Sequence, residues 1–141
     1  DPKARRDFWE EIHRLAAEGL TVLVTTHYMD EAERCHRLAY IAYGKLLAKG
    51  SLREVLHSAG LTTWEVAGPE LGKLAARIRD LPGIEQVTAF GSKLHVSGRD
   101  RAALEKAIGP FRREPHGWRE IEPGLEDAFI GLMQRSEDNF Q

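Results

Sequence analysis

The sequence is poor in cysteine, in excess charge of either sign and in long apolar runs, and each shortage excludes a class of protein. Its single cysteine, Cys35, cannot form an internal disulfide and is typical of a reducing compartment. The 20 Lys and Arg residues against 22 Asp and Glu residues give a formal charge of -2, so no broad basic surface points to nucleic acid. The longest apolar runs, such as residues 20–24, are far too short to span a bilayer, and no charged-then-apolar leader opens the chain.

What is present begins with the pattern of a helix followed by a strand. Asp1 can cap the helix, Pro2 suits the first helical position, and Gly19 supplies a stop. The continuous, β-branched run at residues 20–26 is typical of a strand covered on both faces of a parallel sheet. Such a strand needs neighbouring β-α units, and too few follow it. We therefore expect the chain to begin inside a larger α/β domain whose upstream strands lie outside it.

The rest of the pattern predicts a hairpin, a short helix and a second unit. Residues 38–43 and 45–48 can pair about Gly44, and residues 51–58 form a helix capped by Ser51. From residue 63 onward the order is strand, helix, strand, strand, helix, strand and a terminal helix, which is a ferredoxin-like βαββαβ arrangement. The predicted fold class is α/β with α+β character: the truncated end of an α/β domain at residues 1–58, then a ferredoxin-like domain at residues 61–135.

His27 stands where the apolar strand is expected to end. Side chains at the C-terminal end of a parallel strand face the crevice in which open α/β sheets bind ligands. An imidazole at that place can donate to an anionic phosphate oxygen or orient a water molecule. The structural alternative is that His27 only caps the helix that follows.

A zinc site is a further alternative for His27. His27, Glu31 and Cys35 fall at i, i+4 and i+8, which would align three ligands on one continuous helix. Thr26 still belongs to the strand pattern, and Asp30 with Glu31 is typical of a first helical turn. We therefore expect His27 to lie outside the helix and predict no metal site.

The first 58 residues resemble the closing segment of an ABC-transporter ATP-binding domain of the kind that serves multidrug exporters. In that family an Asp-Pro pair ends the D-loop, the switch histidine stands in T-H-x-x-D-E-A, and a hairpin of the form G-K-L-x-A-x-G closes the unit. The matching stretches, in order and spacing, are Asp1-Pro2, Thr26-His27, Asp30-Glu31-Ala32 and residues 44–50. More loosely, PGLEDAFIGL at residues 123–132 is similar to the last helix of a small C-terminal appendage found in this group.

The resemblance implies a P-loop NTPase domain truncated in this chain, and it implies roles for two residues. His27 would be the H-loop residue that contacts the γ-phosphate, and Asp1 would be the D-loop aspartate that acts across a dimer of ATP-binding domains. The intact subunit would bind ATP and Mg and pair with a membrane permease as a cytoplasmic protein on the inner face of the membrane. It would couple ATP hydrolysis to export of a drug or another small hydrophobic or ionic compound.

No P-loop occurs in these 141 residues. That motif needs Gly, four residues, Gly-Lys and then Ser or Thr, whereas both Gly-Lys pairs, at 44–45 and 72–73, are followed by Leu and have Ala where the first Gly belongs. The chain alone is predicted to bind no nucleotide cofactor and to be inactive. Because the strand at 20–26 would leave an unpaired edge, we expect the chain to form a homo-oligomer.

A different class of function remains open for the second unit. It is the alternative of a free-standing module, without ATPase activity, that binds a regulatory small molecule or dimerises. No glycine-rich loop or group of converging polar residues in the sequence favours ligand binding there, so an interaction and regulatory role is preferred.

Overall fold

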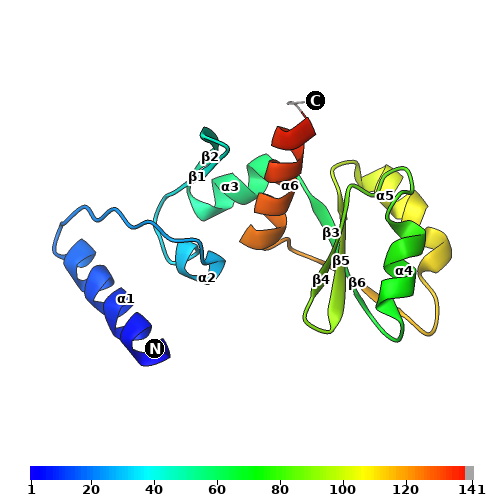
Figure 1. Cartoon of the computed structure of the whole chain (residues 1–141), viewed down its shortest axis with the longest axis horizontal. Helices are drawn as coiled ribbons and strands as arrows, with labels where there is room; N and C mark the ends of the chain where they lie inside the picture. Colours follow the sequence, from blue (N-terminus) through cyan, green and yellow to red (C-terminus); the bar gives the residue numbers. More distant parts are fainter. Residues whose placement is uncertain (139–141) are drawn as a thin grey trace.

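The computed structural model describes residues 1–138, which form two units with the C-terminal helix between them (Figure 1). The first unit holds α1 (Pro2–Ala17), α2 (Met29–Ala32), β1 (Leu38–Ala42), β2 (Lys45–Gly50) and α3 (Leu52–Ala59). The second holds β3 (Thr62–Ala67), α4 (Leu71–Ile78), β4 (Gln86–Phe90), β5 (Lys93–Gly98), α5 (Arg101–Ile108), a 3-10 turn η1 (Gly109–Phe111) and β6 (Gly117–Ile121), and α6 (Leu125–Asp138) ends the described chain.

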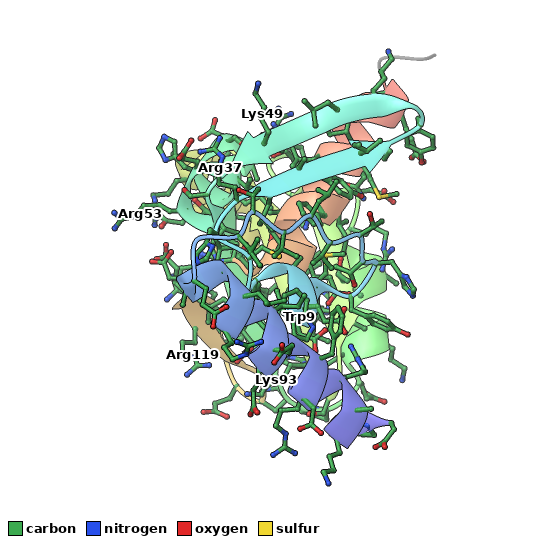
Figure 2. The ribbon with its side chains drawn as sticks, turned by 90° about the vertical axis from the view of Figure 1, so that its left-hand side faces the viewer. Trp9, Arg37, Lys49, Arg53, Lys93 and Arg119 are labelled. Carbon is green, nitrogen blue, oxygen red and sulfur yellow. The ribbon has the colours of Figure 1, made fainter. Side chains whose placement is uncertain are left out.

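Helix α1 begins as the sequence predicts. The Asp1 carboxylate accepts a hydrogen bond from the backbone N–H of Lys3 at 3.0 Å, and Pro2 occupies the first helical position. Trp9 is the buried residue of α1, at 3% exposure, and it is labelled beside this helix in Figure 2. The cap and one buried indole therefore define how this otherwise polar helix starts and packs.

The strand predicted at residues 20–26 does not form, and this prediction is wrong for the described structure. The segment runs as an extended connection between α1 and α2 (Figure 1), and the side chains of Leu20 and Leu23 are 55% and 95% exposed. A strand needs a partner for its backbone groups, and the two sheets within residues 1–138 consist of other strands, β1-β2 and β4-β5-β3-β6. Apolar composition predicted burial, but no described element covers this segment.

The hairpin and the short helix of the first unit confirm their predictions. Strands β1 and β2 pair antiparallel, and their turn holds Tyr43 and Gly44 at φ 53 and 69. The Ser51 hydroxyl accepts from the backbone N–H of Glu54 at 3.2 Å, so it caps α3. Gly60, at φ 65, ends α3 in the left-handed conformation that suits glycine.

The second unit has the predicted element order, and its sheet has the strand order β4-β5-β3-β6 with each neighbouring pair antiparallel. Helices α4 and α5 cover one face of this sheet (Figure 1). The core between them is apolar and consists mainly of Trp64, Val66, Leu74, Ile78, Val96, Leu104 and Ile108. This face follows the alternation expected of a sheet with one packed side.

Helix α6 lies between the sheet and the first unit, an arrangement that the sequence pattern did not predict (Figure 1). Its apolar residues Leu125 and Phe129 belong to the same cluster as Val55 of α3 and Tyr40 of β1. The rings of Tyr40 and Phe129 stack with centroids 3.8 Å apart and planes 6° apart. Because α6 also contacts the sheet through Asp127, it links the two units. No helix within residues 1–138 is both long and apolar enough to cross a membrane.

Candidate functional site

His27 lies on the turn that leads into α2, with its side chain exposed. The residue that precedes the helix is Tyr28, and no side-chain hydrogen bond caps α2. The imidazole instead rests against the Tyr28 ring, with centroids 4.3 Å apart and planes 33° apart. The alternative in which His27 serves to cap the helix is therefore not supported, and the ring is accessible to a ligand.

The turn that carries His27 is held by the hydroxyl of Thr26. Thr26 Oγ1 accepts from the backbone N–H of Tyr28 at 3.0 Å and donates to Glu31 Oε2 at 2.7 Å. One hydroxyl thus closes the turn locally and also joins it to the short helix beyond. This restricts where the His27 backbone can lie.

Arg5 of α1 extends the same network. Its Nε and Nη2 atoms donate to Glu31 Oε1 at 2.9 and 2.6 Å, and its guanidinium lies 4.4 Å above the centre of the Tyr28 ring. The Thr26 hydroxyl and then Arg5 lower the pKa of the Glu31 carboxyl below its usual value. Glu31 therefore stays ionised and binds both groups at neutral pH.

Asp1 lies one helical turn before Arg5. The backbone N–H of Arg5 donates to the Asp1 carbonyl at 3.1 Å, while the Asp1 carboxylate caps α1. Within residues 1–138 no hydrogen bond or ion pair joins Asp1 to His27. The structure connects these two residues through Arg5, Glu31 and Thr26, an arrangement that sequence reasoning missed because it spans 26 positions between Arg5 and Glu31.

In the described residues, the three candidate zinc ligands are not aligned on one helix. Helix α2 begins at Met29 and ends at Ala32, so neither His27 nor Cys35 belongs to it, which confirms that His27 lies outside the helical spacing. Residues 1–138 contain no group of three His, Cys, Asp or Glu side chains placed to hold a metal ion. Burial raises the pKa of the Cys35 thiol, which favours the protonated form over the thiolate that binds zinc.

The two Gly-Lys pairs lie in the wrong local structures for a P-loop. Gly44 occupies the β1–β2 turn, and Gly72 with Lys73 lies inside α4. A P-loop places its glycines between a strand and the N-terminus of a helix, where backbone N–H groups point at phosphate. The geometry of both pairs thus agrees with their sequence mismatch.

A second polar cluster, which the sequence analysis did not identify, lies between α6 and the sheet. His95 of β5 is 8% exposed, with Nδ1 3.1 Å from Asp127 Oδ1 and Nε2 3.2 Å from Glu65 Oε2. Lys93 and Arg119 donate to Glu65 Oε1 at 3.2 and 2.8 Å, and Figure 2 places both on the same side of the molecule. Their separation along the chain hid this cluster from pattern reasoning.

Glu65 is the centre of the charges in that cluster. Hydrogen bonds from Lys93, followed by those from His95 and Arg119, lower the pKa of its carboxyl from 4.5 to about 2. The Asp127 carboxylate also accepts from the backbone N–H of Gly124 at 3.1 Å, just before α6 begins. The cluster therefore attaches the start of α6 to the polar face of the sheet.

Comparison with known proteins finds relatives that are named for ATP binding. No protein-family model matches it. It is 37% identical over 142 residues to the Nod factor export ATP-binding protein I of Ralstonia nicotianae, which covers 96% of this chain and 43% of that protein. The corresponding protein of Paraburkholderia xenovorans is 40% identical over 137 residues, with 96% and 44% covered.

A relative that is named for multidrug transport is also similar to the chain. The chain is 32% identical over 141 residues to the probable multidrug ABC transporter ATP-binding protein YbhF of Escherichia coli, across 94% of this chain and 23% of that protein. The chain spans less than half the length of these curated relatives. They confirm the resemblance drawn from the sequence: the chain is a relative of the ATP-binding subunits of ABC transporters and corresponds to the C-terminal part of such a subunit.

Proposed function

We propose that the protein, when whole, is the ATP-binding subunit of an ABC exporter and couples ATP hydrolysis to export of a small compound across a membrane. The observation that carries the proposal is similarity over 96% of this chain to proteins named for ATP binding and export. The relatives differ in the compound they are named for, so the substrate class stays broad. The 141-residue chain by itself is inactive, because it lacks the P-loop.

His27 is proposed as the H-loop residue that contacts the γ-phosphate of ATP. This proposal is supported by the exposed imidazole and by the turn that carries it, which Thr26 restrains through two hydrogen bonds, to Tyr28 and to Glu31. Phosphoryl transfer depends on positioning and on stabilising charge, so a donor on a restrained turn is more effective than one on a mobile turn. Asp1, whose backbone connects through Arg5 to this turn, is proposed as the D-loop residue that acts across the ATPase dimer.

The proposed fold assigns residues 1–58 to the end of a P-loop NTPase domain and residues 61–135 to a ferredoxin-like domain. The βαββαβ order and the antiparallel strand order β4-β5-β3-β6 support the second assignment. ATP, Mg, a second ATP-binding domain and a membrane permease are the proposed cofactors and partners of the intact subunit. Its proposed location is the cytoplasmic face of the membrane, as a peripheral protein.

The test uses the full-length subunit and its His27→Ala variant. Removal of one preorganised donor to a transition state lowers the turnover by roughly 100-fold or more, so phosphate release should fall by that factor while the subunit stays folded. His36→Ala removes another exposed imidazole nine positions later and should leave hydrolysis unchanged. A full-length subunit without ATPase activity, or equal rates in wild type and His27→Ala, would contradict the proposal.

A further inference from the structure

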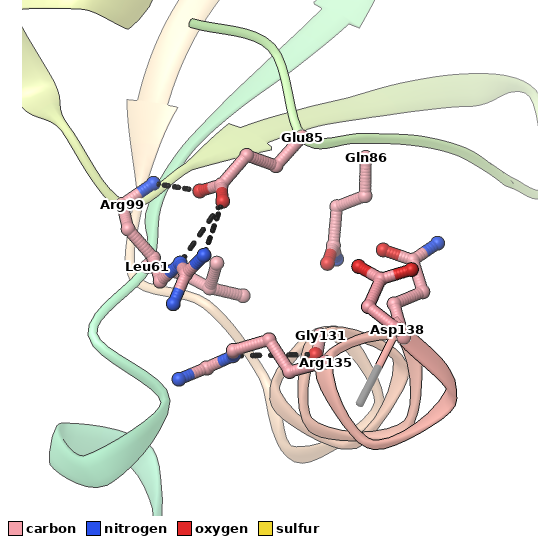
Figure 3. A pocket seen from close by; sticks show the side chains of 8 residues that line it. Leu61, Glu85, Gln86, Arg99, Gly131, Arg135 and Asp138 are labelled. Carbon is pink, nitrogen blue, oxygen red and sulfur yellow. Dashed lines mark hydrogen bonds and ion pairs between the residues drawn. The ribbon is translucent and has the colours of Figure 1, made fainter. Parts of the chain in front are cut away.

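A small pocket opens between the start of β4, the end of β5 and the C-terminal half of α6 (Figure 3). Its volume is about 170 Å³, and its polar lining consists mainly of Glu85, Gln86, Arg99, Arg135 and Asp138. Drug-sized ligands occupy pockets of roughly 300–1,000 Å³, so this pocket suits a smaller molecule. None of these residues belongs to the turn that carries His27.

Gln86 presents an unpaired acceptor to this pocket. The residue is 4% exposed, and its Nε2 donates to the Asp127 carbonyl at 3.1 Å. A carbonyl only accepts, so this bond determines which way the amide points. The opposite atom, Gln86 Oε1, is buried and has no hydrogen-bond partner. A buried acceptor without a donor is unfavourable, and a bound N–H group would correct this.

Arg135 presents a cation whose hydrogen bonds go to neutral groups. Its Nη2 donates to the Ala59 carbonyl at 2.6 Å and its Nε lies 3.4 Å from the Gly131 carbonyl, so both contacts are to neutral backbone. No ion pair joins Arg135 to a carboxylate within residues 1–138. Burial and then the nearby Arg99 lower the pKa of Arg135, while the Glu85 carboxylate raises it. Arg99 and Arg135 both line the pocket. An anion placed there would stabilise both.

The charges of the pocket are separated across it. Glu85 is already bound to Arg99, with Arg99 Nε 2.9 Å from Glu85 Oε1. Figure 3 shows Arg99 and Arg135 toward one side, and Gln86 and Asp138 toward the other. The four ionised groups, two cations and two carboxylates, sum to zero. A neutral ligand with a positive and a negative end therefore matches the lining.

Gly131 lies next to the unpaired oxygen of Gln86. A Cβ at this helical position would lie 3.1 Å from Gln86 Oε1 and 3.5 Å from Leu61 Cδ1. Glycine is less favourable than alanine inside a helix, so its presence here needs a compensating reason. The close approach of Gln86 Oε1 and Leu61 to this turn of α6 supplies one, and a side chain here would press on the Gln86 oxygen.

We propose that this pocket binds a free amino acid or a zwitterion of the same size. Its ammonium group donates to Gln86 Oε1 and faces Asp138, and its carboxylate pairs with Arg135. A simple anion would leave Gln86 unpaired and would meet Asp138, while a simple cation would meet two guanidinium groups. The proposal assigns a site to the ligand-binding alternative for the second unit, and it stands independently of the ATPase function.

The test measures binding by the 141-residue chain itself. Each of the standard amino acids is added at millimolar concentration, and the melting temperature is recorded, because a ligand of the folded state raises it. Calorimetry then compares the best amino acid with its N-acetyl and its carboxamide derivatives. Each derivative lacks one charged end. Its affinity should fall by about tenfold or more, since one charged hydrogen bond is lost.

Two matched glycine variants locate the site. Gly131→Ala places a methyl group beside Gln86 Oε1 and should weaken binding about tenfold, whereas Gly72→Ala, in a helix with open space around it, should leave binding unchanged. Asp138→Asn, at an exposed position, removes the charge facing the ammonium group and gives a second test if Gly131→Ala alters the fold. The proposal is overturned if no amino acid raises the melting temperature, if both derivatives bind like the parent compound, or if these two site variants bind like wild type.

Discussion

Arg5, near the start of α1, donates through Nε and Nη2 to Glu31 Oε1 at 2.9 and 2.6 Å, and this ion pair connects α1 to the turn that holds His27. Thr26 binds the other oxygen of the same carboxylate. The position of His27 therefore depends on α1, because the contact residue Arg5 lies on that helix, more than twenty positions earlier in the chain.

Arg5→Ala should loosen this connection without unfolding the chain. We expect faster amide hydrogen exchange at residues 26–32, because the turn would keep only the Thr26 hydroxyl to hold Glu31. Hydrogen exchange followed by mass spectrometry measures this directly. Arg6→Ala, which changes an adjacent exposed arginine, serves as the control. Equal exchange in both variants would show that the Arg5–Glu31 pair does not restrain the turn.

Asp127→Ala should destabilise the attachment of α6 to the sheet. Asp127 is 1% exposed, and the change would leave His95 Nδ1 and the N–H of Gly124 without their partner. We expect a loss of about 1–3 kcal/mol in the free energy of unfolding, measured by urea denaturation. Glu126→Ala, at the exposed neighbouring position, should change it by less than about 0.5 kcal/mol. A similar effect of both substitutions would exclude a specific role for this cluster.

Glu65 predicts a pH dependence of stability. Its pKa is lowered from 4.5 to about 2 in the folded chain, so its contribution is fully present above pH 4.5 and is lost as the pH falls toward 2. Glu65→Gln removes the titration, and the stability difference between wild type and variant should therefore shrink across that interval. Urea denaturation at several pH values measures the difference. A difference that stays constant down to about pH 2 would be inconsistent with the lowered pKa.

Phe129→Ala should separate α6 from the first unit. Phe129 is 7% exposed and stacks on Tyr40 of the hairpin, so truncation removes both burial and the ring contact. The expected loss in the free energy of unfolding is about 3–5 kcal/mol. Phe129→Leu retains apolar volume and should lose less. If Phe129→Ala and Phe129→Leu lost the same stability, apolar volume at this position would not hold α6 to the first unit, which would contradict the prediction.

The exposed apolar segment predicts self-association of the chain. Leu23 is 95% exposed, and Ile41 and Leu46 of the hairpin are 67% and 54% exposed. We expect light scattering to show a dimer or higher oligomer whose population rises with concentration. Leu23→Lys should shift the equilibrium toward monomer more than Thr21→Lys, which adds the same charge on the same segment. A monomeric wild-type chain at high concentration would disprove the prediction.

Local chemistry made much of the fold predictable from the sequence. The helix caps at Asp1, Ser51 and Asp100 use side chains that bind backbone N–H groups two or three residues ahead, so sequence neighbours suffice to identify them. The alternation of apolar residues likewise predicted the strands and helices of the second unit. The same local reasoning was wrong for residues 20–26, because a strand requires a partner that sequence neighbours cannot supply.

The sequence by itself determined the caps, the hairpin, the element order and the resemblance to the ATP-binding subunits of ABC transporters. Only the tertiary structure decided that α6 lies between the two units, that Glu65, His95 and Asp127 meet, and that Gln86 Oε1 faces a pocket without a partner. The physical reason is distance along the chain. Capping and periodicity act within a few residues, whereas these contacts join segments that are brought together only when the core packs.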